Sequence, residues 1–449
     1  MNKNFLLKKP LARKLYHKVL KELPIIDYHN HLNYQDIATD RQFENITQLW
    51  VASDPYKHRL MRILGVSEEK ITGNSSDFEK FKAWYEVLPR LAGNPLLDWS
   101  QMELSYVFDY ELFPFANVEK AWKDLNKKLE TMPLSQILGK FNLAYIAPCV
   151  SCTDDLSPFQ DNPIMAPSLR GDDMLLPTHE LLDRLCTQTG QAILSLADYL
   201  SAIDKRLAEF LAVGCRFADH ALDDGFDFRA DDGKNDIRFT ALLEGTILEQ
   251  ADALALSSYL LTQLGGLYAK HRIALQLHIG AQRFTSSRLR SLAGPAGGFA
   301  GIGQTLCVRA LTQLLDSIEK TPSGLPHTLL FASNPSDNAV MATLSGSYAK
   351  DACEALVSQG PAWWWCDHYE GMATMLDIFA THSVLSSFIG MTTDSRSPLS
   401  LIRHDYFRRI LCQWVAQMVD LGRMPRDFSL LSDTVYRMCY GNAKRILED

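Results

Sequence analysis

Short apolar segments rich in β-forming residues alternate with longer helical patterns along most of the chain. Eight such segments begin at Leu23, Phe141, Pro163, Gly214, Ile273, His327, Pro361 and Phe388. This alternation is typical of repeated strand–helix units around a parallel sheet. The pattern predicts an α/β fold, and eight segments match a (β/α)8 (TIM) barrel.

The length and composition set the class of protein. The chain has 449 residues, of which 47% are hydrophobic, so it can bury a large core. Its formal net charge of −8 and the absence of a long basic run argue against a nucleic-acid partner. Nine cysteines, an odd number, favour a reducing compartment over a disulfide framework, and no apolar stretch is long enough to span a membrane. We therefore expect a cytoplasmic protein; its oligomeric state stays open.

Two stretches are too long to be simple connections between a strand and a helix. Residues 35–132 and 223–270 both show helical periodicity, and the first is rich in tryptophan. We interpret them as helical insertions after the first and fourth strands of a single barrel unit covering residues 1–449.

Chemically active residues close several of the predicted strands. In a (β/α)8 barrel the active site lies at the carboxyl ends of the strands. His29 and His31 end the first strand, on one face and about 6.5 Å apart at Cα, a spacing that suits a shared metal. Asp394 at the last strand would complete a set of two histidines and one carboxylate that leaves positions for substrate oxygens. Asp219 and His278 end the fourth and fifth strands and are expected to face the same centre.

Three arginines, Arg170, Arg283 and Arg396, follow predicted strands and suggest an anionic substrate. Without a glycine-rich phosphate loop, a carboxylate is the better match for their planar guanidinium groups. Of the tryptophans from Trp363 to Trp365, one would line a sugar site and the others would pack in the core. Cys149 and Cys152 form one isolated CxxC, which we interpret as without a metal or redox role.

At these positions the sequence resembles the uronate isomerase (glucuronate isomerase) family of the amidohydrolase superfamily. The resemblance runs nearly end to end, and the most specific stretches are PIIDYHNHL, GCRFADHAL, LQLHIGAQR and GMTTDSRSPLSLIRHDYFRRILC. It implies a distorted (β/α)8 barrel of the metal-dependent hydrolase type with added helices. It further implies one divalent metal, usually zinc, held at or next to His29, His31 and Asp394. The substrate positions that it implies are Tyr56, Arg170, Asp219, His278, Arg283, Arg396 and one of Trp363 or Trp364.

The chain departs from the family pattern at two places. Pro55 precedes Tyr56 where members commonly carry histidine, and Ala300 stands where an acidic residue is usual. Proline has no titratable group, so any proton transfer by that histidine is lost. His58 is a nearby histidine, which we interpret as a helix-surface residue rather than a replacement.

The resemblance implies aldose–ketose isomerisation of a hexuronate, D-glucuronate or D-galacturonate. We expect Asp394 to move the C2 proton, Tyr56 and the metal to polarise the C1 and C2 oxygens, and an arginine to bind the C6 carboxylate. Two alternatives remain open: a metal-dependent hydrolase or lactonase of the same superfamily, and a catalytically weak sugar-acid binding protein.

Overall fold

The core of the molecule is a curled parallel sheet of seven strands. The computed structural model describes residues 2–448, in which the strand order is β1-β2-β3-β4-β5-β8-β9. The bounds are β1 (Ile25–Asn30), β2 (Leu143–Ser151), β3 (Ser168–Arg170), β4 (Phe217–Leu222), β5 (Ala274–Ile279), β8 (Thr328–Ala332) and β9 (Val357–Gln359). All neighbouring pairs are parallel, and their buried faces form the barrel interior. The predicted α/β barrel class is confirmed.

The eighth position of the barrel is filled by an irregular segment, so the prediction of a regular strand from Phe388 is wrong. Positive φ angles of 97° at Gly390 and 48° at Asp394 break the extended conformation. Asp394 N still donates to His29 O (3.0 Å), and His31 N donates to Ser395 O (2.8 Å). The segment therefore runs beside β1 and closes the barrel without a continuous ladder.

The seventh strand is also displaced from its predicted place. Strand β9 ends at Gln359, two residues before the apolar segment that begins at Pro361. Gly360 N makes the next hydrogen bond, to Leu330 O (2.8 Å), and Pro361 has no N–H with which to continue. Trp364 then takes φ 51° and starts a short 3-10 turn, Trp364–Cys366. The tryptophans thus lie in a turn and not in a strand.

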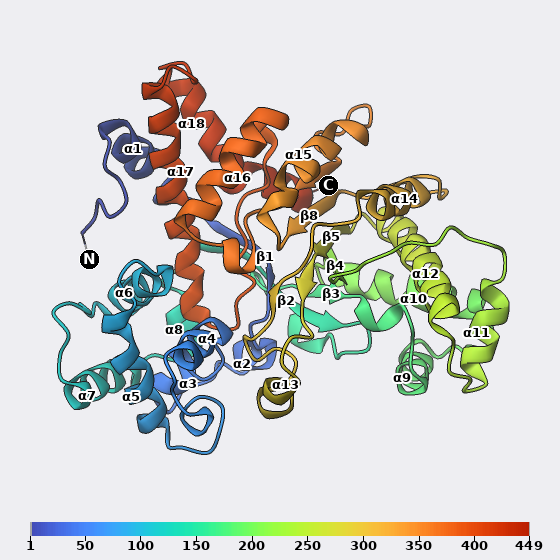
Figure 1. The fold of residues 1–449 in the computed structure, drawn as a ribbon, viewed down its shortest axis with the longest axis horizontal. Helices are drawn as coiled ribbons and strands as arrows, with labels where there is room; N and C mark the ends of the chain where they lie inside the picture. The colour runs from blue at the N-terminus through green and yellow to red at the C-terminus, as the bar shows by residue number, and fades with distance from the viewer. Residues whose placement is uncertain (1, 449) are drawn as a thin grey trace.

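Helices fill the stretch between β1 and β2. Figure 1 shows most of them gathered at one end of the molecule, away from the helices that follow β3 and β4. They are α2 (Tyr34–Ala38), α3 (Ile46–Trp50), α4 (Pro55–Ile63), α5 (Asp77–Val87), α6 (Pro95–Phe108), α7 (Val118–Leu129) and α8 (Leu134–Leu138). Asparagine, aspartate or serine side chains cap the amino ends of α2 to α7. Trp50 and Trp84 are fully buried between them and give this group a core of its own.

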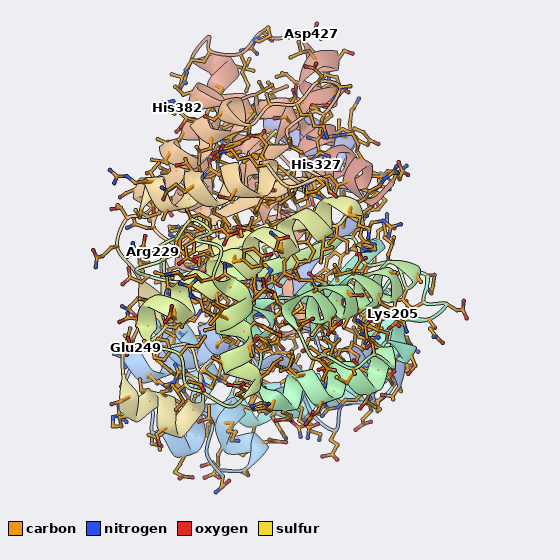
Figure 2. All side chains as sticks on the ribbon, turned by 90° about the vertical axis from the view of Figure 1, so that its right-hand side faces the viewer. Lys205, Arg229, Glu249, His327, His382 and Asp427 are labelled. Atoms are coloured by element: carbon orange, nitrogen blue, oxygen red, sulfur yellow. The ribbon has the colours of Figure 1, made fainter. Side chains whose placement is uncertain are left out.

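The remaining helices, except α13, lie outside the sheet, either on it or packed on one another. They are α1 (Pro10–Leu15), α9 (His179–Thr189), α10 (Leu196–Ala212), α11 (Asn235–Leu243), α12 (Gln250–Lys270), α13 (Ser287–Ala293), α14 (Val308–Glu319), α15 (Asn338–Ser347), α16 (Tyr369–His382), α17 (Arg403–Asp420), α18 (Phe428–Tyr436) and α19 (Asn442–Glu448). Helices α12 and α14 approach closely because Gly265 lacks a Cβ, which would lie 2.7 Å from Ile318 Cδ1. Figure 2 labels three exposed side chains in this region: Lys205 on α10, and Arg229 and Glu249 in the loops before α11 and α12.

Two short strands, β6 (Ala281–Gln282) and β7 (Gly301–Ile302), form an antiparallel ribbon after β5. The ribbon closes a loop that contains α13. Residues after α13 line the pocket at the mouth of the barrel. Among residues 2–448, no helix combines the length and apolarity needed to cross a membrane.

Candidate active site

One pocket opens at the carboxyl ends of the strands and collects nearly all of the predicted site residues. Its wall contains His29, His31, Tyr56, Arg170, His278, Arg283, Trp363, Trp364, Asp394 and Arg396. Asp219 lies just behind the wall, fully buried. Chain segments far apart in the sequence therefore meet at one place, as expected for the catalytic face of this type of barrel.

The two histidines of the first strand converge on a single carboxylate oxygen. His29 Nε2 lies 3.3 Å and His31 Nε2 lies 3.1 Å from Asp394 Oδ1. Donor atoms bound to one tetrahedral metal ion are separated by about 3.3 Å. The nitrogen and oxygen atoms therefore have the type and spacing of a divalent metal site.

Asp394 is held from its other side by two indoles. Its Oδ2 accepts hydrogen bonds from Trp363 Nε1 (2.8 Å) and Trp364 Nε1 (2.9 Å). Burial alone would raise the pKa of Asp394, but the hydrogen bonds to His29 and His31 hold it well below its usual range. The carboxylate is ionised, and Oδ1, the oxygen that faces His29 and His31, is the one not bonded to the indoles.

A buried carboxylate also anchors the opposite side of the pocket. Asp219 Oδ2 lies 3.1 Å from Arg170 Nη1 and 3.4 Å from His278 Nδ1. Burial opposes the charge of Asp219, yet the Arg170 guanidinium keeps the pKa of this group well below its usual range. Asp219 is thereby ion-paired with Arg170 and in contact with His278.

His278 is a neutral imidazole with one unused nitrogen. Burial and the neighbouring His29 lower the pKa of His278 to about 4. Its ring stacks on Trp363 with centroids 4.8 Å apart. His278 Nε2 is buried and has no hydrogen-bond partner among residues 2–448. The pocket therefore has a polar atom available to a bound group.

The three predicted arginines differ in how far they are committed to protein partners. Arg170 pairs with Asp219 as described, and Arg283 Nε donates to Asp223 Oδ1 (2.8 Å). The guanidinium of Arg396 forms no ion pair within residues 2–448, although it lines the pocket. Arg396 is therefore the arginine most available to an anionic ligand.

Tyr56 enters the pocket from the helical insertion. It lies in the first turn of α4, where Asp54 Oδ1 accepts hydrogen bonds from the Tyr56 and Lys57 backbone N–H groups. Its ring packs edge-on against Trp365, with centroids 5.3 Å apart. Burial raises the pKa of the Tyr56 hydroxyl, so it stays protonated and can donate a hydrogen bond.

A loop of which the sequence analysis singled out only Ala300 completes the wall beside the start of α4. Pro295, Ala296, Gly298 and Ala300 line the pocket. Gly298 has φ +80°, and a Cβ there would lie 2.2 Å from Pro55 O. Only glycine allows the loop to approach α4 this closely.

A second missed residue, Asp27, supports the site from beneath. Asp27 accepts hydrogen bonds from the Thr392 hydroxyl (3.0 Å), the Thr393 N–H (2.7 Å) and the Thr393 hydroxyl (2.8 Å). His404 Nε2 lies 3.0 Å from the same carboxylate. Asp27 therefore fastens the irregular segment that carries Asp394 to strand β1.

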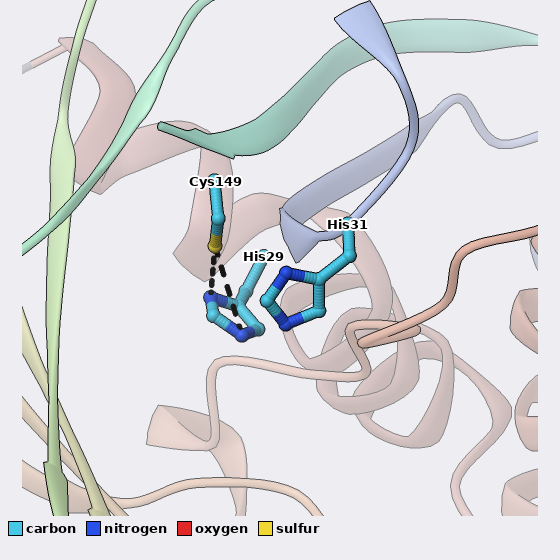
Figure 3. Close-up of side chains that lie close together, drawn as sticks. All are labelled: His29, His31 and Cys149. Atoms are coloured by element: carbon cyan, nitrogen blue, oxygen red, sulfur yellow. Dashed lines mark hydrogen bonds between the residues drawn. The ribbon is translucent and has the colours of Figure 1, made fainter. Parts of the chain in front are cut away.

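Cys149 is a further side chain that the sequence did not place in the site, and our interpretation of its CxxC left it without a role. Figure 3 shows it reaching from β2 toward His29 and His31. Donor atoms of these three residues all lie within 4.8 Å of one another. Register between β1 and β2 produces this contact, and periodicity in the sequence carries no signal for it.

The interpretation of His58 as a helix-surface residue is wrong. His58 is 5% exposed, and its Nε2 lies 2.9 Å from Val51 O. Burial lowers the pKa of His58 to about 4. It faces the interior of the insertion and does not line the pocket.

Comparisons with known proteins agree on one family. The model of the glucuronate isomerase family matches residues 1–447. The uronate isomerases of Vibrio vulnificus and Salmonella paratyphi A are 36% and 37% identical to this chain, and both matches cover 99% of it and 98% of the relative.

Solved structures give the same result. A uronate isomerase from Thermotoga maritima superposes with a TM-score of 0.91 at 26% identity, covering 100% of this chain and 99% of its own. A glucuronate isomerase from Caulobacter crescentus gives a TM-score of 0.89 at 22% identity, with 100% and 97% covered, and so supports the fold. A candidate metal-dependent hydrolase from Lactobacillus casei, at a TM-score of 0.55 and 10% identity, covers 97% of both chains and shares the fold only.

Proposed function

Because this chain belongs to the uronate isomerase family, we propose that its pocket interconverts a hexuronate aldose and the corresponding ketose. The reaction takes D-glucuronate to D-fructuronate, D-galacturonate to D-tagaturonate, or both. Matches to curated uronate isomerases over 99% of the chain support this reaction class. The observation in the pocket that best supports the proposal is the ionised Asp394. It lies between two histidines and two indoles, beside Arg396, which has no ion pair among residues 2–448.

Isomerisation requires ring opening, removal of the proton at C2 and delivery of a proton to C1. Asp394 Oδ1 is our choice for the group that carries this proton, since Oδ2 is occupied by the Trp363 and Trp364 indoles. The two indoles keep the carboxylate aimed while its charge changes. Positioned acid–base groups of this kind typically contribute about 10²–10⁴-fold in rate.

The remaining groups bind and polarise the sugar acid. Arg396 would pair with the C6 carboxylate, because its guanidinium has no ion pair among the described residues. Tyr56 donates a hydrogen bond to the oxygen at C1 or C2, and neutral His278 donates or accepts one through Nε2. Arg170, Asp219, Arg283 and the tryptophans Trp363 and Trp364 complete the substrate contacts in this proposal.

One divalent metal belongs to the proposed site. His29, His31 and Asp394 would hold it, and the spacing of their donor atoms supports that assignment. When bound, a divalent ion stabilises negative charge that develops on the C1 and C2 oxygens. Zinc is our choice of metal, and a cytoplasmic location without nucleic-acid partners completes the proposal.

Hydrolysis by the same site is less well supported. The sixth strand of the parallel sheet, β8, is followed by Ser333 and Asn334, neither of which is the histidine expected for a second metal. Strand β4 carries no lysine that would bridge two metals. The family comparisons likewise favour isomerisation.

A small substrate panel tests the proposal. Metal content of the purified protein is measured, and ketouronate formation is followed with D-glucuronate and D-galacturonate, beside hydrolysis of lactones and binding of the unreacted acids. We expect metal-dependent ketouronate formation. Lactone hydrolysis without isomerisation would favour a hydrolase, and tight uronate binding without turnover would favour a binding protein.

A further inference from the structure

Arg403 is a buried arginine behind the pocket wall that has no part in the isomerisation scheme. It is the first residue of α17 and only 2% exposed. Its guanidinium pairs with the carboxylate of Asp367, which is equally buried. Asp367 directly follows the 3-10 turn Trp364–Cys366, the tryptophan turn, and its N–H donates to Trp364 O (3.1 Å). The ion pair therefore joins the start of α17 to the turn that contributes an indole to Asp394.

The Arg403 guanidinium also lies against the ring of Tyr56. Its Cζ is 5.4 Å from the ring centroid of Tyr56 and 4.7 Å from that of Trp99. The Tyr56 and Trp99 rings meet edge-on, with centroids 6.0 Å apart. A cation within about 6 Å of an aromatic centroid is attracted by the electrons of the ring face. Arg403 thus presents a fixed positive charge to the tyrosine that lines the pocket.

The ion pair is poorly explained as a purely structural contact. Arg403 Nε and Asp367 Oδ1 are buried and have no hydrogen-bond partner among residues 2–448. Removing two charges from water is costly, and the cost is recovered only when the remaining donors and acceptors are also satisfied. Two apolar side chains of similar volume would fill the same space without this cost. The charge of Arg403 therefore indicates a use beyond stability.

The positive charge acts on the Tyr56 hydroxyl. Burial raises the pKa of this hydroxyl, and the Arg403 guanidinium lowers it. Three carboxylates near the ring raise the same pKa together with burial: Asp394, Asp367 and Asp54. A more acidic phenol is a stronger hydrogen-bond donor, because its oxygen better accommodates negative charge. Arg403 therefore opposes the surroundings that would weaken Tyr56 as a donor.

We propose that Arg403 is a positioning residue that acts through Tyr56: it holds the ring at the pocket wall and strengthens the hydroxyl as a donor to the C1 or C2 oxygen. This inference rests on the proposed function, because that function supplies the oxygen to which Tyr56 donates. Asp367 fixes the guanidinium from the end of the tryptophan turn. Among residues 2–448, the pocket wall does not include Arg403 itself.

A double-mutant cycle with Tyr56→Phe tests this role by steady-state kinetics of the full chain. Tyr56→Phe should lower kcat by about 10²–10³-fold, the usual loss for one donor to a developing oxyanion. Arg403→Gln removes the charge and should lower kcat by about 10²-fold, with little change in KM. In the Tyr56→Phe background the same substitution should cost less than about 2-fold, because the hydroxyl through which it acts is already absent.

Two further variants separate this role from general destabilisation. Arg403→Lys keeps the positive charge but loses the planar group, so its kcat should lie between those of the wild type and Arg403→Gln. The matched control is Arg408→Lys. Arg408 is a buried arginine of the same helix, but it donates to backbone carbonyl groups just before β1. Arg408→Lys should leave kcat and KM unchanged, both alone and combined with Tyr56→Phe.

The possible failures are distinguishable. Equal losses from Arg403→Gln in the two backgrounds would show that Arg403 acts independently of Tyr56, and would overturn the inference while leaving the proposed function intact. Wild-type kcat in Arg403→Gln would overturn it as well. If Arg403→Gln does not fold, the cycle built on Arg403→Lys decides by the same criterion. A wild-type protein that forms no ketouronate would contradict both the proposed function and this role of Arg403.

Discussion

The two halves of the pocket wall are built in different ways. In the regular half, His29, Asp219 and His278 project from β1, β4 and β5, where parallel strand pairing, continuous along β4 and β5, fixes the backbone. In the irregular half, the wall is formed by the first turn of α4, the tryptophan turn and the segment carrying Asp394 and Arg396. Two residues of the irregular half, Trp364 and Asp394, have φ angles of 51° and 48°.

The two halves hold their side chains by different means. Left-handed backbone at a residue other than glycine costs roughly 1–3 kcal/mol and persists only where surrounding contacts enforce it. At Asp394 those contacts are the two indoles and the bonds between Asp27 and the preceding threonines. The strands thus hold His29, Asp219 and His278 in place, whereas the irregular half orients Asp394, the carboxylate that we propose to transfer the proton.

The largest effect is expected when the charge of the irregular half is removed. Asp394→Asn should lower kcat by about 10⁴-fold, the upper end for loss of a positioned base, and change KM little. The matched variant Asp223→Asn changes a carboxylate after β4 that pairs with Arg283 at 2.8 Å. It should alter KM more than kcat. Steady-state kinetics check both, and near-normal turnover by Asp394→Asn would remove this residue from the mechanism.

A smaller effect is expected when the hydrogen bonds from Thr392 and Thr393 to Asp27, which join the two halves, are weakened. Asp27→Asn keeps the shape but loses acceptors for the Thr392 and Thr393 donors, so Asp394 is less well aimed. Metal affinity or kcat should fall by about 10–100-fold, as for other outer supports of metal sites. The control is Asp405→Asn, on the same helix as His404, since Asp405 bonds to Tyr16 and Arg409 instead. Equal losses in both variants would indicate general destabilisation.

Replacing Pro55, in the irregular half, with histidine is expected to raise activity. It lines the pocket at the first position of α4, where its missing N–H costs no hydrogen bond. Pro55→His would place an imidazole at the pocket wall and should raise kcat for cyclic uronates about 10-fold, a modest share of the usual acid–base contribution. Pro55→Asn, which removes proline without adding a titratable group, should not. If both variants match the wild type, ring opening does not depend on this position.

His58 should affect stability and not catalysis. Its folded-state pKa of about 4 lies below the ordinary value of 6.5, so the unfolded chain binds more protons between these pH values. The contribution of His58 to the free energy of unfolding is therefore present above pH 6.5 and is lost as the pH falls toward 4. Denaturant unfolding of His58→Gln should show a shallower pH dependence across this window, with kcat unchanged at neutral pH. An unchanged slope would contradict the buried neutral state.

Much of the regular half was predictable from the sequence, and much of the irregular half was not. Alternating patterns placed β1 to β5 and β8 because strands with buried faces leave a strong periodic signal. The apolar residues after Pro361 and Phe388 show the same strand-like pattern, but positive φ angles at Trp364 and Gly390 prevent regular strands there. Such angles follow from tertiary contacts that no local pattern encodes.

The site shows the same limit. Strand-end position was enough to select His29, His31 and His278, which line the pocket. Cys149 was passed over because its contact with His29 depends on the register of two strands over 100 residues apart in the chain. Asp27 precedes the first histidine by two residues, yet its role appears only when the segment at Thr393 is seen beside β1.

The central claim is that Asp394 moves a proton between C2 and C1 of a hexuronate, and isomerisation in heavy water tests it most directly. The enzyme is incubated with a uronate in D₂O, and the ketouronate is examined by NMR for deuterium at C1. Proton transfer through an ionised carboxylate that exchanges with solvent predicts deuterium at C1. Its complete absence, with full conversion to product, would indicate a direct hydride shift and would contradict the role of Asp394 as the base.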